Sequence, residues 1–203
     1  MEHKAFLRVG LGSMRDTMEA YCCLSDQTWH RLEKICKPLG LAKNMFFIQQ
    51  GRTPHSFAYV HSGLLRAYTT DATGNEYNKQ FFAENSFPGS MVALLTSSPS
   101  GFSIECLEDS CLLEIDHRAY RELLLACDDL KLFHILYLEK NWVIEKEKRE
   151  VSLVQSDATQ RYLVFRQNHP GLAQRIPQYH IASHLGITPT QLSRIRKGLT
   201  AAK

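Results

Sequence analysis

The sequence has no long apolar run and few cysteines. No window approaches the roughly 18–20 consecutive apolar residues of a membrane-spanning helix, and the N-terminus lacks the features of a secretory signal. The six cysteines are too sparse for a disulfide scaffold and show no Cys-x-x-Cys spacing. We therefore expect a cytoplasmic protein with reduced thiols.

Acidic residues are missing from the C-terminal segment. No Asp or Glu occurs from Thr159 to Lys203, although the whole chain has 24 Lys and Arg and 21 Asp and Glu. Clustered positive charge attracts polyanions, so this segment is expected to bind nucleic acid. Its basic residues are Arg161, Arg166, Arg175, Arg194, Arg196, Lys197 and Lys203.

The middle of the chain is rich in short β-type runs. With 203 residues, 44% of them apolar, the chain is long enough for two small domains of a soluble protein. Between Met45 and Ile115, β-branched and aromatic runs alternate with Gly, Pro, Asn and Asp, which predicts a small antiparallel barrel, jelly roll or sandwich. The expected strands are Met45–Gln49, Phe57–His61, Leu64–Thr70, Tyr77–Phe82, Gly101–Leu107 and Cys111–Asp116.

Helices are expected on both sides of this region. Residues 1–20 show no sustained periodicity and are expected to form a flexible tail. Ser25 is a good N-cap for a helix from Asp26, and Gly40 is placed to end it. A long helix is expected from 129 to 155, because apolar residues follow a three-four repeat there, interrupted by Lys140 and Glu147. The apolar residues are Leu130, Phe133, Tyr137, Ile144, Val151 and Val154. By periodicity alone, this helix either pairs with a second copy or packs on its own domain.

Residues 177–197 have the pattern of two short helices joined by a tight turn. Ile181 and Leu185 lie one helical turn apart and form the inner stripe of the first helix. Ala182 is small where two helices must cross closely. Gly186 supplies the left-handed residue that ends the first helix.

The second helix has a strong start signal and two distinct faces. Thr188, Pro189 and Gln191 fit the N-cap, first and third positions of a capping box. Apolar residues share one face, while polar and basic side chains project from the other, as a major-groove reader requires. The apolar face comprises Leu192, Ile195 and Leu199. Predicted base contacts are Thr190, Ser193 and Arg194, and predicted phosphate contacts are Thr188, Gln191, Arg196 and Lys197.

The motif Ile181-Ala-Ser-His-Leu-Gly-Ile-Thr-Pro-Thr-Gln-Leu-Ser-Arg-Ile-Arg-Lys197 resembles the helix-turn-helix of the CRP/FNR family of transcription regulators. Weaker similarity to that family's cyclic-nucleotide-binding-like β-roll runs through Tyr59–Arg66, Gln80–Phe87 and Leu107–Ser110. The resemblance implies an α+β chain with a double-stranded β-helix or jelly-roll sensor domain, a long dimerisation helix and a small all-α helix-turn-helix domain. It also implies a homodimer on a two-fold-related site in double-stranded DNA, with RNA polymerase as a further partner.

On this basis the chain divides into four parts. Residues 1–20 are the flexible tail, 21–128 the sensor domain, 129–155 the dimerisation helix and 156–203 the helix-turn-helix domain. The segment from His169 to Pro177 is too short and too poor in β-branched residues for the β-hairpin of a winged domain. We therefore expect a short helical turn or loop there.

The resemblance breaks down where relatives hold a cyclic nucleotide. Members that bind one carry a Gly-Glu pair and a downstream Arg, whereas Ser90 stands here where Glu is expected. No Lys or Arg occurs between Lys79 and Arg118, so a buried phosphate would lack its cationic partner. We therefore expect an effector other than cyclic AMP. Its candidate pocket comprises Gly89, Ser90, Met91 and Ser103.

Neither of the two metal sites that the His and Cys residues suggest is expected. His180 and His184 have the spacing of zinc ligands on one helix face, but no nearby carboxylate completes a site. The simpler role for both is on the outer polar face of their helix. An iron–sulfur cluster needs four correctly spaced thiolates, and Cys22, Cys23 and Cys36 do not supply them. Redox sensing by a single cysteine stays open.

Two other classes of protein fit the sequence less well. A cupin-like barrel, as a small-molecule-binding protein or enzyme with an incidental basic tail, would need a His-x-His pair and a Glu, which His55 and His61 do not provide. No catalytic set is recognisable, so we expect no enzyme activity and no cofactor. A β-roll that acts through protein partners would leave the acid-free segment unexplained.

Overall fold

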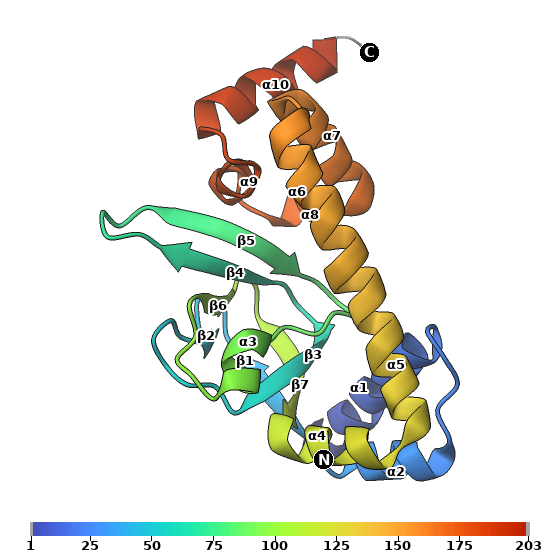
Figure 1. Ribbon diagram of the computed structural model, residues 1–203. Helices are drawn as coiled ribbons and strands as arrows, with labels where there is room; N and C mark the ends of the chain where they lie inside the picture. Colours follow the sequence, from blue (N-terminus) through green and yellow to red (C-terminus); the bar gives the residue numbers. More distant parts are fainter. Residues whose placement is uncertain (1, 202–203) are drawn as a thin grey trace.

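The computed structural model describes residues 2–201 and has two parts joined by one long helix (Figure 1). The N-terminal part contains two antiparallel sheets with helices around them, and the C-terminal part is a group of short helices. The predicted α+β class is therefore confirmed. No helix among residues 2–201 is long and apolar enough to cross a membrane.

The two sheets pack around an apolar core. One sheet has the order β1 (Cys36–Leu41), β7 (Ser110–Asp116), β3 (Ser56–Ser62), and the other has β2 (Phe46–Ile48), β6 (Ser103–Cys106), β4 (Leu65–Thr70), β5 (Glu76–Phe82). Each expected strand is present within a few residues. Side chains from both sheets fill the space between them, including Val60, Leu65, Ile104 and Leu112.

Strand β1 was not predicted, because Pro38 and Gly40 interrupt its sequence pattern. It pairs only with β7, so it is an edge strand, where a missing backbone donor is tolerated. The expected end of the preceding helix at Gly40 was wrong. That helix, α2, spans Asp26–Glu33, and its N-cap is Ser25 as expected, with the Ser25 hydroxyl accepting from the Thr28 amide.

The prediction of a flexible tail at residues 1–20 was also wrong. Residues Glu2–Glu19 form helix α1, which packs against β1, β3 and β7. Met14 and Met18 are fully buried in the core that α1 shares with α2, the sheet, and helix α4 (His117–Ala126). Tertiary burial thus stabilises a helix whose local signal is weak. Helix α3 (Met91–Thr96) lies between β5 and β6 in sequence.

The long connecting helix forms near its expected bounds. It consists of α5 (Asp128–Leu138), the π-helical segment η1 (Glu139–Ile144) and α6 (Glu145–Gln155). In its first half this helix packs on its own domain, because Leu130 and Phe133 are buried against the N-terminal core. Other apolar side chains of this helix are exposed: Leu132, Ile135, Trp142, Val143, Ile144 and Val151.

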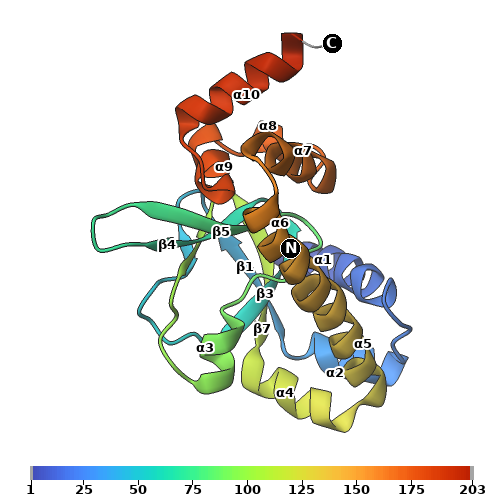
Figure 2. The same cartoon turned by 45° about the horizontal axis from the view of Figure 1, so that its top comes forward.

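Four helices form the C-terminal part: α7 (Ala158–Asn168), α8 (Leu172–Arg175), α9 (Gln178–Leu185) and α10 (Pro189–Ala201). The short helix α8 lies in the segment where a helical turn was expected in place of a β-hairpin. The core of this C-terminal part includes Tyr162, Phe165, Ile181 and Leu192. Figure 2 shows α10 at the outer end of the molecule, with α9 between it and the sheets.

Candidate nucleic-acid interface

The turn between α9 and α10 has the expected geometry. Gly186 caps α9 in the left-handed region, with φ at +67°. The Gln191 amide donates to the Thr188 hydroxyl (3.2 Å), and the Gln191 side-chain oxygen accepts from the Thr188 amide (2.9 Å). These reciprocal bonds form the predicted capping box and fix where α10 begins.

Helix α10 has one buried and one exposed face. Leu192 is fully buried, and Ile195 and Leu199 pack partly buried beside it. The residues predicted to contact DNA lie elsewhere on the helix: Thr188, Thr190, Gln191, Arg194 and Lys197 are exposed, while Ser193 and Arg196 are half-buried. Helix α10 and its N-cap Thr188 therefore carry all seven residues, five of them exposed.

An open hollow adjoins one side of α10. It is lined by Gln178 at the start of α9 and by Ser193, Arg196, Lys197 and Thr200 of α10. Arg196 thus lies at the flank nearer α9, whereas Arg194 points from the exposed face. This placement agrees with different roles for the two arginines.

Of the six basic residues of the C-terminal segment that the structure describes, Arg161 and Arg175 make hydrogen bonds or ion pairs within the protein. Arg161 donates to the backbone oxygens of Ser156 (2.6 Å) and Leu185 (3.2 Å), so it links the end of the long helix to the end of α9. Arg175 bonds to carboxylates of the N-terminal part. The positive charge open to a ligand is therefore smaller than the sequence count.

Arg175 connects the two parts of the molecule through three loops. Its guanidinium makes bidentate bonds with Glu84 (2.8 and 2.9 Å) and with Glu108 (3.1 and 2.7 Å), and it also donates to the Gly63 carbonyl. We call these residues the Arg175 clamp. The hydrogen bonds from Arg175 lower the pKa of Glu84 to about 2, so Glu84 is ionised at neutral pH.

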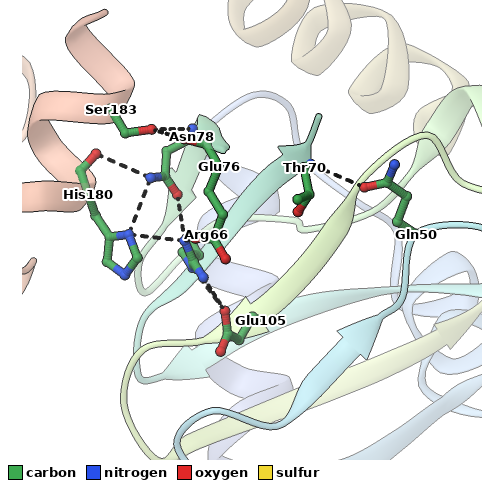
Figure 3. A network of polar contacts seen from close by, with 8 residues as sticks. All are labelled: Gln50, Arg66, Thr70, Glu76, Asn78, Glu105, His180 and Ser183. Carbon is green, nitrogen blue, oxygen red and sulfur yellow. Dashed lines mark hydrogen bonds and ion pairs between the residues drawn. The ribbon is translucent and has the colours of Figure 1, made fainter. Parts of the chain in front are cut away.

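A second polar network joins β4 and β5 to α9 (Figure 3). Arg66 is buried beneath α9 and pairs with Glu76 and Glu105. Its Nη1 lies 3.0 Å from Nδ1 of His180, and since a guanidinium can only donate, His180 accepts through an unprotonated Nδ1. Burial, with Arg66 adding to it, lowers the pKa of His180 to about 4.

Ser183 and His184 of α9 also face the sheet. The Asn78 backbone amide donates to the Ser183 hydroxyl, and His184 Nδ1 lies 3.0 Å from the Asn78 carbonyl oxygen. The expectation that His180 and His184 lie on the outer face of α9 was therefore wrong. Among residues 2–201 no cluster of three or more His, Cys, Asp or Glu is arranged to hold a metal ion.

The candidate effector residues Gly89, Ser90 and Ser103 are buried and bonded within the protein. Ser90 accepts from the Ser100 hydroxyl (2.9 Å), and Ser103 accepts from the Gln50 amide (3.0 Å). Gly89 packs so tightly that an added Cβ would lie 2.8 Å from Cβ of Phe57. Met91 differs, because it lines an apolar cavity beside the long helix.

Sequence reasoning missed the junction residues Arg66, Asn78, Glu84 and Glu108. Each contacts α8 or α9 across a separation of more than sixty residues in the chain. No local pattern signals such a pairing. The clue in the sequence was Arg66 itself, a single charged residue in a strand whose neighbouring residues are apolar.

Comparison with known proteins supports this arrangement. Residues 39–127 match the cyclic nucleotide-binding domain family. No curated protein sequence matches the chain. Among solved structures, the c-di-GMP-responsive global regulator CLP of Xanthomonas campestris has a TM-score of 0.68 at 15% identity, covering 88% of this chain and 93% of its own.

Two further solved structures are similar to this chain. FixK2 of Bradyrhizobium japonicum has a TM-score of 0.69 at 14% identity and covers 83% of this chain and 86% of its own. A CooA variant of Carboxydothermus hydrogenoformans has a TM-score of 0.67 at 16% identity, and the match covers 91% of this chain and 84% of the CooA chain. Residues 39–127 therefore match the model of the cyclic nucleotide-binding domain family, and the chain shares its overall fold with these three proteins.

Proposed function

We propose that the protein is a homodimeric transcription regulator that binds double-stranded DNA in a sequence-specific manner through α10. The observation that carries the proposal is the helix itself. Its capping box fixes its start, Leu192 anchors its apolar face, and Thr190, Arg194 and Lys197 remain exposed within an acid-free segment. A helix of this kind fits the major groove.

The exposed residues of α10 divide into two roles. Thr190, Ser193 and Arg194 contact base edges, where Arg pairs with guanine through two hydrogen bonds. Thr188, Gln191, Arg196 and Lys197 contact phosphate, helped by the positive end of the helix dipole at the start of α10. The hollow between Arg196 and the start of α9 leaves room for a phosphate strand.

The exposed apolar residues of the long helix support dimerisation. Ile135, Val143 and Val151 are 51%, 59% and 46% exposed although they are apolar. Apolar side chains repeated along one helix favour pairing with a second copy. Two copies would present two α10 helices to a two-fold-related operator, and RNA polymerase is a further partner by analogy with the family.

The β-roll responds to a signal other than cyclic AMP. The interior between the sheets is filled by apolar side chains, and no Lys or Arg lies between Lys79 and Arg118 to pair with a phosphate. Calorimetry with cyclic AMP should give no saturable heat. A micromolar isotherm would contradict this argument.

A binding series across salt concentrations tests the proposal. The protein is titrated against duplex fragments selected from random DNA, and the affinity should fall steeply from low to moderate salt. The variant Lys197→Ala should weaken binding, while Lys37→Ala, which removes an exposed charge on β1, should not. Affinity that barely changes with salt would favour the alternative, a small-molecule-binding β-barrel protein with an incidental basic tail.

A further inference from the structure

An apolar cavity lies between the sheets and the long helix. Its free volume is about 40 Å³. Aromatic rings dominate its wall, and Phe57 and Tyr120 meet edge to face at a centroid distance of 5.0 Å, as do Phe87 and Tyr137 at 5.4 Å. Met91, Tyr120, His134, Leu138 and Trp142 are among the residues that line it.

We propose that this cavity is the effector site and that it binds a small, uncharged, largely apolar molecule with one hydrogen-bonding group. The identity of the site as an effector site rests on the proposed regulatory function. None of its lining residues is Asp, Glu, Lys or Arg, so a charged ligand would lose its hydration without gaining a partner. A cyclic nucleotide is therefore excluded from it.

One polar pair marks the end of the cavity where a ligand's polar group would bind. The Tyr120 hydroxyl lies 3.2 Å from Nδ1 of His134. Burial lowers the pKa of His134, so its ring is neutral at neutral pH, and with Nδ1 engaged by Tyr120 its Nε2 is left to bond a ligand. An apolar wall with a few polar groups is typical of small-molecule sites.

The size of the cavity limits the ligand. Since one water needs about 10–15 Å³ of such volume, the cavity as it stands holds about three non-hydrogen atoms. Trp142, 37% exposed, forms part of the wall and belongs to the π-helical segment η1. Short π-helical segments are frequent at functional sites, and rotation of this indole would admit a single ring.

The cavity is connected to the DNA-binding part by a short segment of chain. Phe87 packs on Tyr137 and Phe133 of α5, and Glu84, three residues earlier, belongs to the Arg175 clamp. Between them Asn85, with φ at +65°, accepts a hydrogen bond from the Tyr59 hydroxyl. A ligand that displaces Phe87 therefore acts on the clamp that positions α8 and α9.

Fluorine NMR of the full chain labelled with 5-fluorotryptophan tests the site. The chain has two tryptophans, so Trp29, which does not line the cavity, serves as an internal reference for Trp142. We expect xenon and phenol each to shift the Trp142 resonance in a saturable manner. The resonance is assigned with Trp142→Phe. Absence of a saturable shift with both probes would overturn the proposal.

Matched variants locate the binding. Leu138→Phe places a larger side chain at the cavity and should weaken phenol binding by about tenfold or more. Leu125→Phe makes the same change at a side chain that is 69% exposed on α4 and should leave binding unchanged. Tyr120→Phe should weaken phenol but leave xenon unaffected, provided that melting curves show all variants folded. Equal binding by Leu138→Phe and Leu125→Phe would overturn the location.

A DNA-binding measurement with and without phenol tests the effector role. Phenol should change the affinity for selected DNA in the unmodified chain and leave it unchanged in Leu138→Phe. If DNA binds but phenol changes nothing in either protein, the effector role is overturned. If no DNA binds at all, the proposed function fails, while the fluorine spectra still decide whether the cavity holds a ligand.

Discussion

Replacing Arg175 by Met should loosen the contact between the C-terminal helices and the sheets while leaving each part folded. The two oxygens of Glu84 and Glu108 that share Arg175 Nη2 lie 2.9 and 2.7 Å from it, so they are at most 5.6 Å apart, the sum of these distances. Without the cation, two carboxylates at that separation repel by about 1–3 kcal/mol for effective dielectric constants between 80 and 20. The three side chains are about one-third exposed, which favours the lower end.

Hydrogen exchange measured by mass spectrometry reports this loss directly. Peptides covering α9 and β5 should exchange about fivefold faster or more in Arg175→Met, since about 1 kcal/mol corresponds to that factor. Arg166→Met is the matched control, because Arg166 is exposed in the same segment and takes no part in the clamp. Adding Glu84→Gln to Arg175→Met should recover part of the protection by removing the repulsion.

The pH dependence of the same protection provides a second measure. Glu84 has a pKa lowered to about 2 in the folded protein from an ordinary value of 4.5. The contribution of Glu84 to the stability of the contact between the two parts is therefore fully present above about pH 5, and it is lost as the pH falls toward 2. Arg175→Met should flatten this dependence. Identical exchange and identical pH profiles in Arg175→Met and Arg166→Met would refute the clamp.

Three further predictions concern DNA binding and assembly. Arg194→Ala should cost about 1–3 kcal/mol on selected DNA only, whereas Arg196→Ala should weaken selected and random duplexes alike in gel shifts; equal losses on both duplexes for both variants would show that the roles were wrongly assigned. Thr188→Ala should lower stability in thermal unfolding by about 1 kcal/mol through loss of the cap, and no change would contradict the capping role. Ile135→Lys should convert dimers to monomers in analytical ultracentrifugation, and Leu125→Lys, a control on α4, should not; persistent dimers in Ile135→Lys would place the dimer contact elsewhere.

Features governed by neighbouring residues could be predicted from the sequence. The strands follow from short β-type runs between turn residues, and the start of α10 follows from the spacing of Thr188 and Gln191. Gly186 marks the end of α9 because the left-handed conformation found there favours glycine. In each case the deciding interaction lies within one or two turns of chain.

Features governed by distant residues could not be predicted. Helix α1 contains Gly10 and Gly12, which weaken its local signal, and it is stabilised by burial of Met14 and Met18 against the sheet. The side of α9 that faces the sheet is set by the contact of His180 with Arg66, which lies more than a hundred residues away in the chain. His180 was therefore expected on the outer face of its helix, although it is buried in the junction.

The engagement of Arg161 and Arg175 gives the salt dependence of DNA binding a structural meaning. If all seven basic residues of each segment neutralised a phosphate, a dimer would show a logarithmic salt slope of about −13, at about −0.9 per phosphate. Without Arg161 and Arg175 the limit is about −9, even when Lys203, outside the described residues, is included. A slope more negative than about −9 would mean that DNA binding opens the Arg175 clamp and frees more positive charge. In that case Arg175→Met, in which the clamp is already open, would bind DNA at low salt more tightly than expected for a protein that has lost one positive charge.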